Sequence, residues 1–289
     1  MELVHEKTPL MGYGNCNSCT GNIIVEYWFA GLKSEVQKLR QRLRGSFVHV
    51  DYKDRYVRAA YMYAYFPFYI EPIYEAIINH TEKIHLSTQQ ELNVTFIGGG
   101  PIPELLGLSK VITQKRNDIE KINSYVLDAV PHWASERRIC TEEILRSYWE
   151  KEFSIVTKEY DFFQYQMDVP SVIRECDIIV VQNCINDCPQ GSVTHIERNI
   201  KEIWLSMRKN SIIILLDLNY VTISELITRL QTFFTSNSGR VIKPISSINN
   251  HRPNIPFCDH LETKLYEPGV DGLIARRNVN YYSSIVKKD

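Results

Sequence analysis

The chain has 289 residues, of which 44% are hydrophobic and 23% are charged. These fractions are close to those of ordinary globular domains, and the length suits one large domain or two small ones. The 33 basic and 34 acidic side chains give a formal net charge of −1. The net charge therefore does not indicate nucleic acid as a partner, because no global positive field is available for counterion release.

Residues 1–11 are of mixed polarity and lack the basic start, apolar run and cleavage site of a secretory signal. No stretch of about 18 apolar residues runs without a charge, so we expect no membrane span. Seven cysteines, an odd number, are scattered along the chain, which argues against a disulfide framework. The simplest expectation is a cytoplasmic protein in a reducing compartment.

Residues 1–90 are predicted to be mostly helical, because apolar side chains recur there near helical spacing. The expected helices cover 22–44, 54–65 and a third segment from 67 or 70 to 80, with proline at 67 as a breaker or starter. We expect this region to cover the ligand cleft of the remaining chain and to help select the substrate.

The pattern changes near residue 91 to short, apolar, β-branched runs. The clearest are 92–97 (LNVTFI), 177–182 (DIIVVQ) and 211–217 (SIIILLD), with further strands expected at 125–127, within 154–167, at 240–245 and at 273–276. Helices are expected over 103–123, 142–151, 195–208 and 224–234. Continuous apolar strands separated by helices are typical of a parallel sheet that is covered on both faces.

The predicted fold class is therefore α/β. Right-handed crossovers favour a doubly wound arrangement, so residues 91–289 are expected to form a Rossmann-like, doubly wound, mainly parallel sheet. An α-helical N-terminal region precedes it.

Three glycines, Gly98, Gly99 and Gly100, directly follow the first of these strands and precede Pro101. In doubly wound sheets, ligands bind beyond the carboxyl ends of the strands, near the point where the strand order reverses. Glycine there permits positive φ and lets a ligand approach the main chain. A glycine-rich turn is common, but its place between a buried strand and a helix favours a ligand site.

The second strand ends in Asp128, whose carboxylate can accept hydrogen bonds from both hydroxyls of a ribose. The alternative is a solvated aspartate or a cap for the next helix; the glycine turn favours the ribose. Asp128 lies 30 positions after Gly98, whereas the dinucleotide fingerprint expects an acid about 20 residues on. A longer first helix, including residues 114–121, can absorb this difference. The turn also reads GGGPIP rather than G-x-G-x-x-G, and this departure disfavours a nicotinamide cofactor.

The ordered segments VTFIGGGPIPELLGL, YVLDAVPHW, CDIIVVQNCINDCP and SIIILLDLNY resemble the motif set of class I S-adenosylmethionine-dependent methyltransferases. The likeness covers roughly residues 92–286. It implies that S-adenosylmethionine is the cofactor and that the chain is a methyltransferase acting on an acceptor that the sequence does not identify.

The resemblance also implies roles for single residues. Gly98 and Gly100 would border the methionine part of the cofactor, Asp128 would hold the ribose, and Asp168 would contact the adenine amino group, with Asp161 as its rival. The cofactor-binding set is Gly98, Gly99, Gly100, Pro101, Asp128, Ala129, Asp168 and Asn183.

The segment after the fourth strand, residues 182–187, is expected to line the reaction cleft, and the catalytic candidates by position are Asn183, Asn186 and Asp187. Methyl transfer depends mainly on alignment, which contributes up to ~7–11 kcal/mol; a base is needed only where the acceptor must lose a proton. The segment lacks the Asn/Asp-Pro-Pro-aromatic motif of amino-methylating nucleic-acid enzymes. Cys188-Pro189 also reverses the Pro-Cys order of cytosine C5 enzymes, so Cys188 is interpreted as a buried thiol.

Three other patterns in the sequence could mark a site, and each has a structural explanation. Cys16 and Cys19 have zinc-ligand spacing that Cys184 and Cys188 could complete, but only one true C-x-x-C occurs and no metal site is predicted. The aromatic run at 61–69 is interpreted as packing of the helical region on the sheet, with base stacking as the alternative. The proline-rich segment 251–258 is expected to be a loop of the same lid.

Two further functions stay open. Nicotianamine-synthase-like enzymes, which transfer the aminocarboxypropyl group of the same cofactor, are similar in their Gly-x-Gly-Pro turn and in the helices before it. The nonstandard segment 183–186 also allows a binding or assembly protein without turnover. Methylthioadenosine as a product would indicate the first alternative, and S-adenosylhomocysteine would indicate methylation. The oligomeric state cannot be inferred from the sequence.

Overall fold

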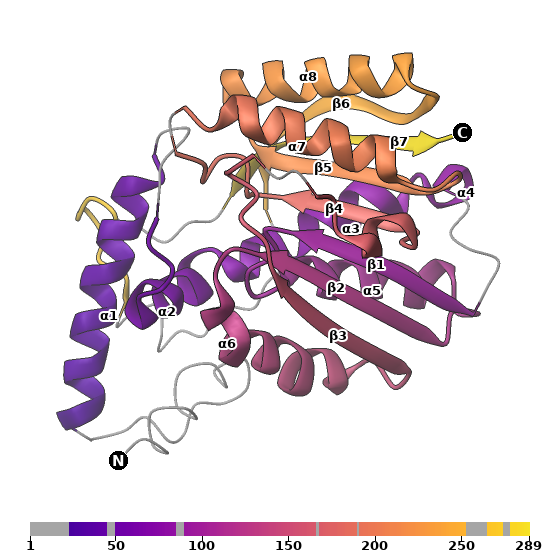
Figure 1. The fold of residues 1–289 in the computed structure, drawn as a ribbon. Helices are drawn as coiled ribbons and strands as arrows, with labels where there is room; N and C mark the ends of the chain where they lie inside the picture. The colour runs from indigo at the N-terminus through magenta and orange to yellow at the C-terminus, as the bar shows by residue number, and fades with distance from the viewer. Residues whose placement is uncertain are drawn as a thin grey trace.

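The computed structural model describes residues 23–44, 50–84, 90–165, 168–189, 191–252, 265–273 and 278–289. Their centre is one seven-stranded sheet of order β3-β2-β1-β4-β5-β7-β6 (Figure 1). The strands are β1 (Glu91–Ile97), β2 (Lys121–Asp128), β3 (Glu152–Glu159), β4 (Ile178–Gln182), β5 (Ile212–Leu218), β6 (Gly239–His251) and β7 (Val279–Lys288).

The strands β1 to β5 are parallel, and β7 runs antiparallel between β5 and β6. The order 3-2-1-4-5 reverses direction between β1 and β4, which is the switch point of a doubly wound sheet. The Rossmann-like α/β fold class that the sequence predicts is confirmed.

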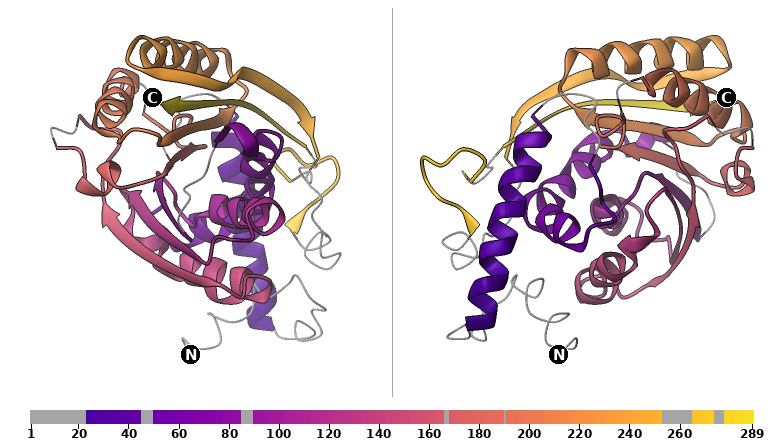
Figure 2. Two further views of the ribbon diagram at one scale, coloured as in Figure 1. Left: turned by 90° about the vertical axis from the view of Figure 1, so that its right-hand side faces the viewer. Right: turned by 60° about the vertical axis from the view of Figure 1, so that its left-hand side comes forward.

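The helices cover both faces of the sheet. They are α1 (Ile23–Arg42), α2 (Arg55–Ala64), α3 (Glu71–Ile78), α4 (Thr81–Ile84), α5 (Pro103–Lys115), α6 (Ala134–Arg138), α7 (Val193–Ser206) and α8 (Val221–Ser236). Side chains of a strand alternate between faces, so Ile178 and Val180 join the core under α3 and α5, while Ile179 and Val181 join the core under α7 and α8. Figure 2 shows α7 and α8 outside the curved sheet and the N-terminal helices inside it.

The helices before residue 90 share one hydrophobic core with the sheet. Buried Leu32 and Ile73 belong to the same cluster as Val94 and Phe96 of β1. The contact of α3 with α5 depends on Gly107, where a β carbon would lie 2.1 Å from the Ile70 carbonyl oxygen. The division into domains at 1–90 and 91–289 stays a prediction, but the packing ties the two parts closely together.

Two predicted helices were wrong in extent. The helix expected over 103–123 ends at Lys115, because β2 already begins at Lys121 and pairs with β1 from Lys121 to Leu127. Backbone pairing extends a parallel strand through polar residues such as Asn123, which the apolar pattern alone does not reveal. The helix expected over 142–151 consists of a π-helical turn over Ile139–Ile144 and a 3₁₀ turn over Leu145–Ser147.

The last strands also differ from expectation. The expected strand at 273–276 is wrong at Leu273, which lies outside any strand, and its other residues lie outside the described ranges. The chain instead returns through β7, where the polar Ser283 and Ser284 are fully buried. The Ser284 hydroxyl lies 3.0 Å from the Gln231 side-chain oxygen, so internal hydrogen bonding makes a polar sequence acceptable in the sheet. No helix within the described ranges is long and apolar enough to cross a bilayer.

Candidate functional site

A cavity of about 660 Å³ opens at the carboxyl ends of β1, β2, β3 and β4. Its size falls in the range of about 300–1,000 Å³ that is usual for small-molecule sites. The segments after these four strands and two parts of the helical N-terminal region line it. The cavity therefore lies at the switch point, where doubly wound sheets bind ligands.

The floor of the cavity is the glycine turn, residues 98–101. Gly98 and Gly100 have φ of 63° and 48°, in the left-handed region that favours glycine. A β carbon on Gly98 would lie 2.5 Å from the Cys184 β carbon, so the turn presses directly against the loop after β4. The Gly98 N–H donates to the Leu127 carbonyl at 2.7 Å. The turn is therefore a fixed part of the sheet edge.

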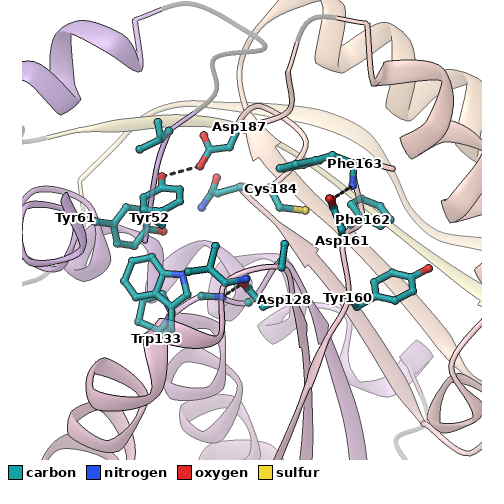
Figure 3. A pocket seen from close by; sticks show the side chains of 18 of the residues that line it. Tyr52, Tyr61, Asp128, Trp133, Tyr160, Asp161, Phe162, Phe163, Cys184 and Asp187 are labelled. Carbon is teal, nitrogen blue, oxygen red and sulfur yellow. Dashed lines mark hydrogen bonds between the residues drawn. The ribbon is translucent and has the colours of Figure 1, made fainter. Parts of the chain in front are cut away.

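Asp128, at the end of β2, fastens the turn from the side (Figure 3). Its Oδ2 accepts from the Gly100 N–H at 2.8 Å and its Oδ1 from the Val130 N–H at 2.7 Å. Burial raises the pKa of this carboxyl, and the two hydrogen bonds oppose that rise. Each oxygen keeps a second acceptor position, so Asp128 can still accept hydroxyl donors from a ligand.

Glu104, which the sequence analysis did not single out, lines the cavity from the first turn of α5. It is buried, and its Oε2 has no hydrogen-bond partner. Burial, and secondly the nearby Asp128, raises the pKa of the Glu104 carboxyl to about 8. Its only sequence signal is an acidic residue just after a glycine turn.

Of the three catalytic candidates on the loop after β4, two line the cavity and one does not. Asn183, with φ of 53°, and Asp187 line the cavity, whereas Asn186 is buried and does not belong to the lining. Asp217, fully buried on β5, accepts from the Ile185 and Asn186 N–H groups at 2.9 and 3.3 Å and so holds the loop. Burial raises the pKa of Asp187 and that of Asp217, each to about 7.

The roof of the cavity consists of Tyr52, Tyr61 and Trp133. The ring centres of Tyr52 and Tyr61 are 5.6 Å apart, and Trp133 lies 5.3 Å from the first and 5.5 Å from the second. The Tyr52 hydroxyl donates to Asp187 Oδ2 at 2.8 Å. Tyr52 and Trp133 carry no local sequence signal for a site, since only tertiary contact brings them to the cavity.

Arg58 on α2 holds the roof in place. Its Nε donates to Glu136 Oε1 at 3.0 Å, and its Nη1 donates to the carbonyls of Tyr52 and Lys53 at 3.0 and 2.9 Å. The Arg58–Glu136 ion pair is buried, with 10% of each side chain exposed. The pair joins the N-terminal region to α6, which follows β2.

The aromatic run at 61–69 divides between packing and the site. Tyr65, Phe66, Phe68 and Tyr69 are buried in the core, as the packing interpretation expects. Tyr61 alone of this run lines the cavity.

The opposite side of the cavity is formed by residues 159–163, which follow β3 (Figure 3). Asp161 lines the cavity, with its Oδ1 accepting from the Phe163 N–H at 3.0 Å. Asp168 is exposed and is not part of the lining. The structure thus brings together Gly98, Gly99, Gly100, Pro101, Asp128, Ala129, Asn183 and Asp187, and leaves Asp168 and Asn186 outside.

The cavity is strongly acidic. Among the described residues that line it, Lys53 is the one lysine or arginine, and it is exposed. Six carboxyl groups face this single cation: Asp51, Glu104, Asp128, Glu159, Asp161 and Asp187. A site of this charge favours cationic ligands over phosphorylated ones.

The remaining sequence candidates lie elsewhere. Cys16, Cys19 and residues 253–258 are outside the described ranges, while His251 ends β6. Cys184 and Cys188 are free, buried thiols, and burial raises the pKa of Cys188 to about 12. Within the described part of the chain, no group of three or more potential ligands could hold a metal ion.

No protein-family model matches the sequence, and no curated protein matches it. Among solved structures, the chain is similar to precorrin-6y C5,15-methyltransferase from Geobacter metallireducens, with 12% identity and a TM-score of 0.39 over 73% of this chain and 86% of that one. It is also similar to an S-adenosylmethionine-dependent methyltransferase from Clostridium acetobutylicum, with 12% identity and a TM-score of 0.36 over 74% and 90%. Both similar proteins are methyltransferases, and the Rossmann-like α/β fold of this chain rests on its own strand order.

Proposed function

We propose that this protein is an S-adenosylmethionine-dependent methyltransferase whose cofactor lies between the glycine turn and Asp128. The observation that carries this proposal is an acidic cavity at the switch point of the sheet. In dinucleotide-binding folds, a pyrophosphate sits at the N-terminus of the helix after the glycine turn. Here the first turn of that helix places the carboxyl group of Glu104 in the cavity, beside those of Asp128, Glu159 and Asp161, and this lining does not suit a pyrophosphate.

S-adenosylmethionine fits the charge of the cavity, because it carries a positive sulfonium and an ammonium group but no phosphate. Gly98, Gly99 and Gly100 line the cavity where the methionine part would lie. Asp128 retains acceptor positions for the ribose hydroxyls.

The adenine would lie on the β3 side of the cavity. Tyr160, Phe162 and Phe163 supply aromatic surface there. We assign the contact to the adenine amino group to Asp161, because Asp168 lies outside the lining. The methyl group would then point toward the roof formed by Tyr52, Tyr61 and Trp133, away from β3 (Figure 3).

When bound, the cofactor supplies an electrophilic methyl group. The residues of the chain supply alignment and a dry environment, and alignment alone contributes up to ~7–11 kcal/mol. Tyr52, Tyr61 and Trp133 exclude water above the reacting centre, and Asp187 is placed to interact with an acceptor. Localisation in the cytoplasm remains an expectation from the cysteine content.

The test is calorimetry with S-adenosylmethionine and S-adenosylhomocysteine, using the intact chain and the variant Asp128→Ala. We expect binding by the intact chain and affinity at least tenfold weaker in the variant, because hydrogen bonds to a charged group contribute about 1.5–3 kcal/mol each. Asp118→Asn, an exposed residue before β2, is the control and should bind normally. Absence of binding by the intact chain would contradict the proposal.

Product analysis distinguishes the reaction classes. S-adenosylhomocysteine formed in the presence of a cell extract supports methyl transfer. Methylthioadenosine would instead establish aminocarboxypropyl transfer. Tight cofactor binding with neither product would favour a binding or assembly protein.

A further inference from the structure

The roof end of the cavity, the part lined by Tyr52, Tyr61, Trp133, Glu104 and Asp187, combines aromatic rings with carboxyl groups. Three aromatic rings, those of Tyr52, Tyr61 and Trp133, contact one another there. The carboxyl groups of Asp187 and Glu104 line the same cavity. Asp187 accepts a hydrogen bond from the Tyr52 hydroxyl, while Glu104 Oε2 is buried without a hydrogen-bond partner.

These carboxyl groups act on the same region. The Tyr61 hydroxyl has a raised pKa, mainly from burial, and the charges of Glu104, Asp187 and Asp128 each contribute to the rise. Within the described residues, neither Glu104 nor Asp187 forms an ion pair with a basic side chain. The roof end therefore holds two buried carboxyl groups, and no basic side chain of the described residues pairs with either of them.

Aromatic faces combined with carboxylates bind ammonium groups. The ring quadrupole attracts a cation that lies over the ring face, by about 0.5–2 kcal/mol. A buried carboxylate is costly unless a positive partner or hydrogen-bond donors reach it. A protonated amine supplies both a positive charge and up to three donors, so it satisfies the free acceptor positions of Asp187 and Glu104.

We propose that the methyl acceptor is an aliphatic amine, bound as its ammonium form at the roof end, and that Asp187 takes its proton. The proposal rests on the proposed function and names its substrate class. One oxygen of the Asp187 carboxylate accepts a proton from the ammonium nitrogen, so the carboxyl becomes neutral and the nitrogen regains its lone pair. The nitrogen then bonds to the methyl carbon as the carbon–sulfur bond breaks, and that electron pair remains on sulfur as the neutral thioether of S-adenosylhomocysteine.

The surroundings of Asp187 suit this role. The Tyr52 hydroxyl holds one carboxyl oxygen at 2.8 Å, and the charge of Asp187 adds to the burial that raises the pKa of Asp217 on the neighbouring strand β5. Burial raises the pKa of Asp187 to about 7, which brings its proton affinity closer to that of an amine at neutral pH.

The experiment titrates amines into the protein saturated with S-adenosylhomocysteine. The probes are 1,4-diaminobutane and its neutral counterpart 1,4-butanediol. A third probe is Nα-acetyl-lysine amide, whose free side-chain ammonium represents a lysine of a protein. We expect at least one ammonium probe to bind at least tenfold more tightly than the diol. Preference for the diamine indicates a free amine as the acceptor, and preference for the lysine amide indicates a protein side chain.

The variant Asp187→Asn keeps the shape of the side chain and an oxygen for the Tyr52 hydroxyl. We expect it to bind the ammonium probe at least tenfold more weakly, with S-adenosylhomocysteine affinity within threefold of the intact chain. Asp118→Asn is the matched control, because it removes an exposed carboxylate before β2, on the loop that ends α5.

Three outcomes overturn the inference: no ammonium probe binds, the diol binds equally well, or Asp187→Asn binds the ammonium probe as well as the intact chain does. The comparison of diamine with diol needs no variant, so a failure of Asp187→Asn to fold leaves the inference testable. Normal binding of S-adenosylhomocysteine with no ammonium binding would refute this inference alone. Loss of S-adenosylhomocysteine binding by the intact chain would refute the proposed function itself.

Discussion

The floor of the cavity is held by hydrogen bonds from its own N–H groups to the adjacent strand β2, whereas the roof is held by side chains from distant segments. On the floor, the Asp128 carboxylate reaches the Gly100 N–H across 28 positions within one β-α-β unit. In the roof, the Tyr52 hydroxyl reaches Asp187 across 135 positions, and Arg58 reaches Glu136 across 78. The floor is therefore a local device, while the roof exists only when the N-terminal region docks on the sheet.

Under the proposed function, this difference would separate cofactor binding at the floor from acceptor selection at the roof. A substitution in the roof can move the roof residues while the glycine turn keeps its geometry. A change in the floor disturbs the sheet edge on which both parts rest. The following substitutions test that separation, beginning with the largest expected effect.

Arg58→Met breaks the buried ion pair that holds the roof and leaves Glu136 without its partner. We expect a loss of roughly 3–5 kcal/mol in the free energy of unfolding, because an unpaired buried charge is costly. Urea unfolding measures it. The double variant Arg58→Met, Glu136→Leu should recover most of the loss, since both charges are then gone. A single-variant loss below about 1 kcal/mol would show that the ion pair does not hold the roof.

Gly98→Ala tests the floor. Its φ of 63° and a β carbon 2.5 Å from that of Cys184 predict a loss of about 2–4 kcal/mol, from backbone strain and overpacking together. Thermal or urea unfolding measures it. Gly31→Ala is the control, because Gly31 lies within α1 with no atom close to its missing β carbon. There alanine should stabilise by about 0.5–1 kcal/mol, and equal effects at both sites would contradict the rigid floor.

Glu104→Gln tests the protonation of the buried carboxyl group that lines the cavity from the first turn of α5. Burial raises the Glu104 pKa from 4.5 to about 8, so the folded protein keeps a proton that the unfolded chain releases. This contribution to stability is full below about pH 4.5 and is lost as the pH rises through about 8. Relative to the glutamine variant, the intact chain should therefore lose about 1–3 kcal/mol between about pH 5 and pH 8.

Unfolding of the two proteins in urea at both pH values measures this difference. The expected result is a gap that widens with pH in favour of Glu104→Gln. Parallel pH profiles would show that Glu104 is already ionised in the folded protein.

Tyr52→Phe is the mildest change to the roof, because it keeps the ring and removes one hydrogen bond to Asp187. We expect a loss of about 0.5–1.5 kcal/mol in the free energy of unfolding, with S-adenosylhomocysteine affinity unchanged. Tyr165→Phe, an exposed tyrosine outside the cavity lining, should have no effect. A strong loss of S-adenosylhomocysteine affinity in Tyr52→Phe would show that roof and floor are not separable.

The sequence predicts the floor well because its signals are local. The apolar run before Gly98 forms β1, and the runs at 177–182 and 211–217 form β4 and β5. The order of the segments along the chain also predicts the glycine turn after β1 and the acidic residue, Asp128, at the end of β2. The positions of Asp168 and Asp161 depend on how the chain turns after β3, and only Asp161 lines the cavity.

The sequence by itself determined the parallel sheet, its switch point and the glycine turn, because strand and turn preferences act between neighbours along the chain. Only the tertiary structure decided the roof, the burial of Glu104 and the polar strand β7. Each of these depends on contacts across many positions, such as Tyr52 with Asp187. Their free energies arise from burial and from hydrogen bonds that do not exist until the chain has folded.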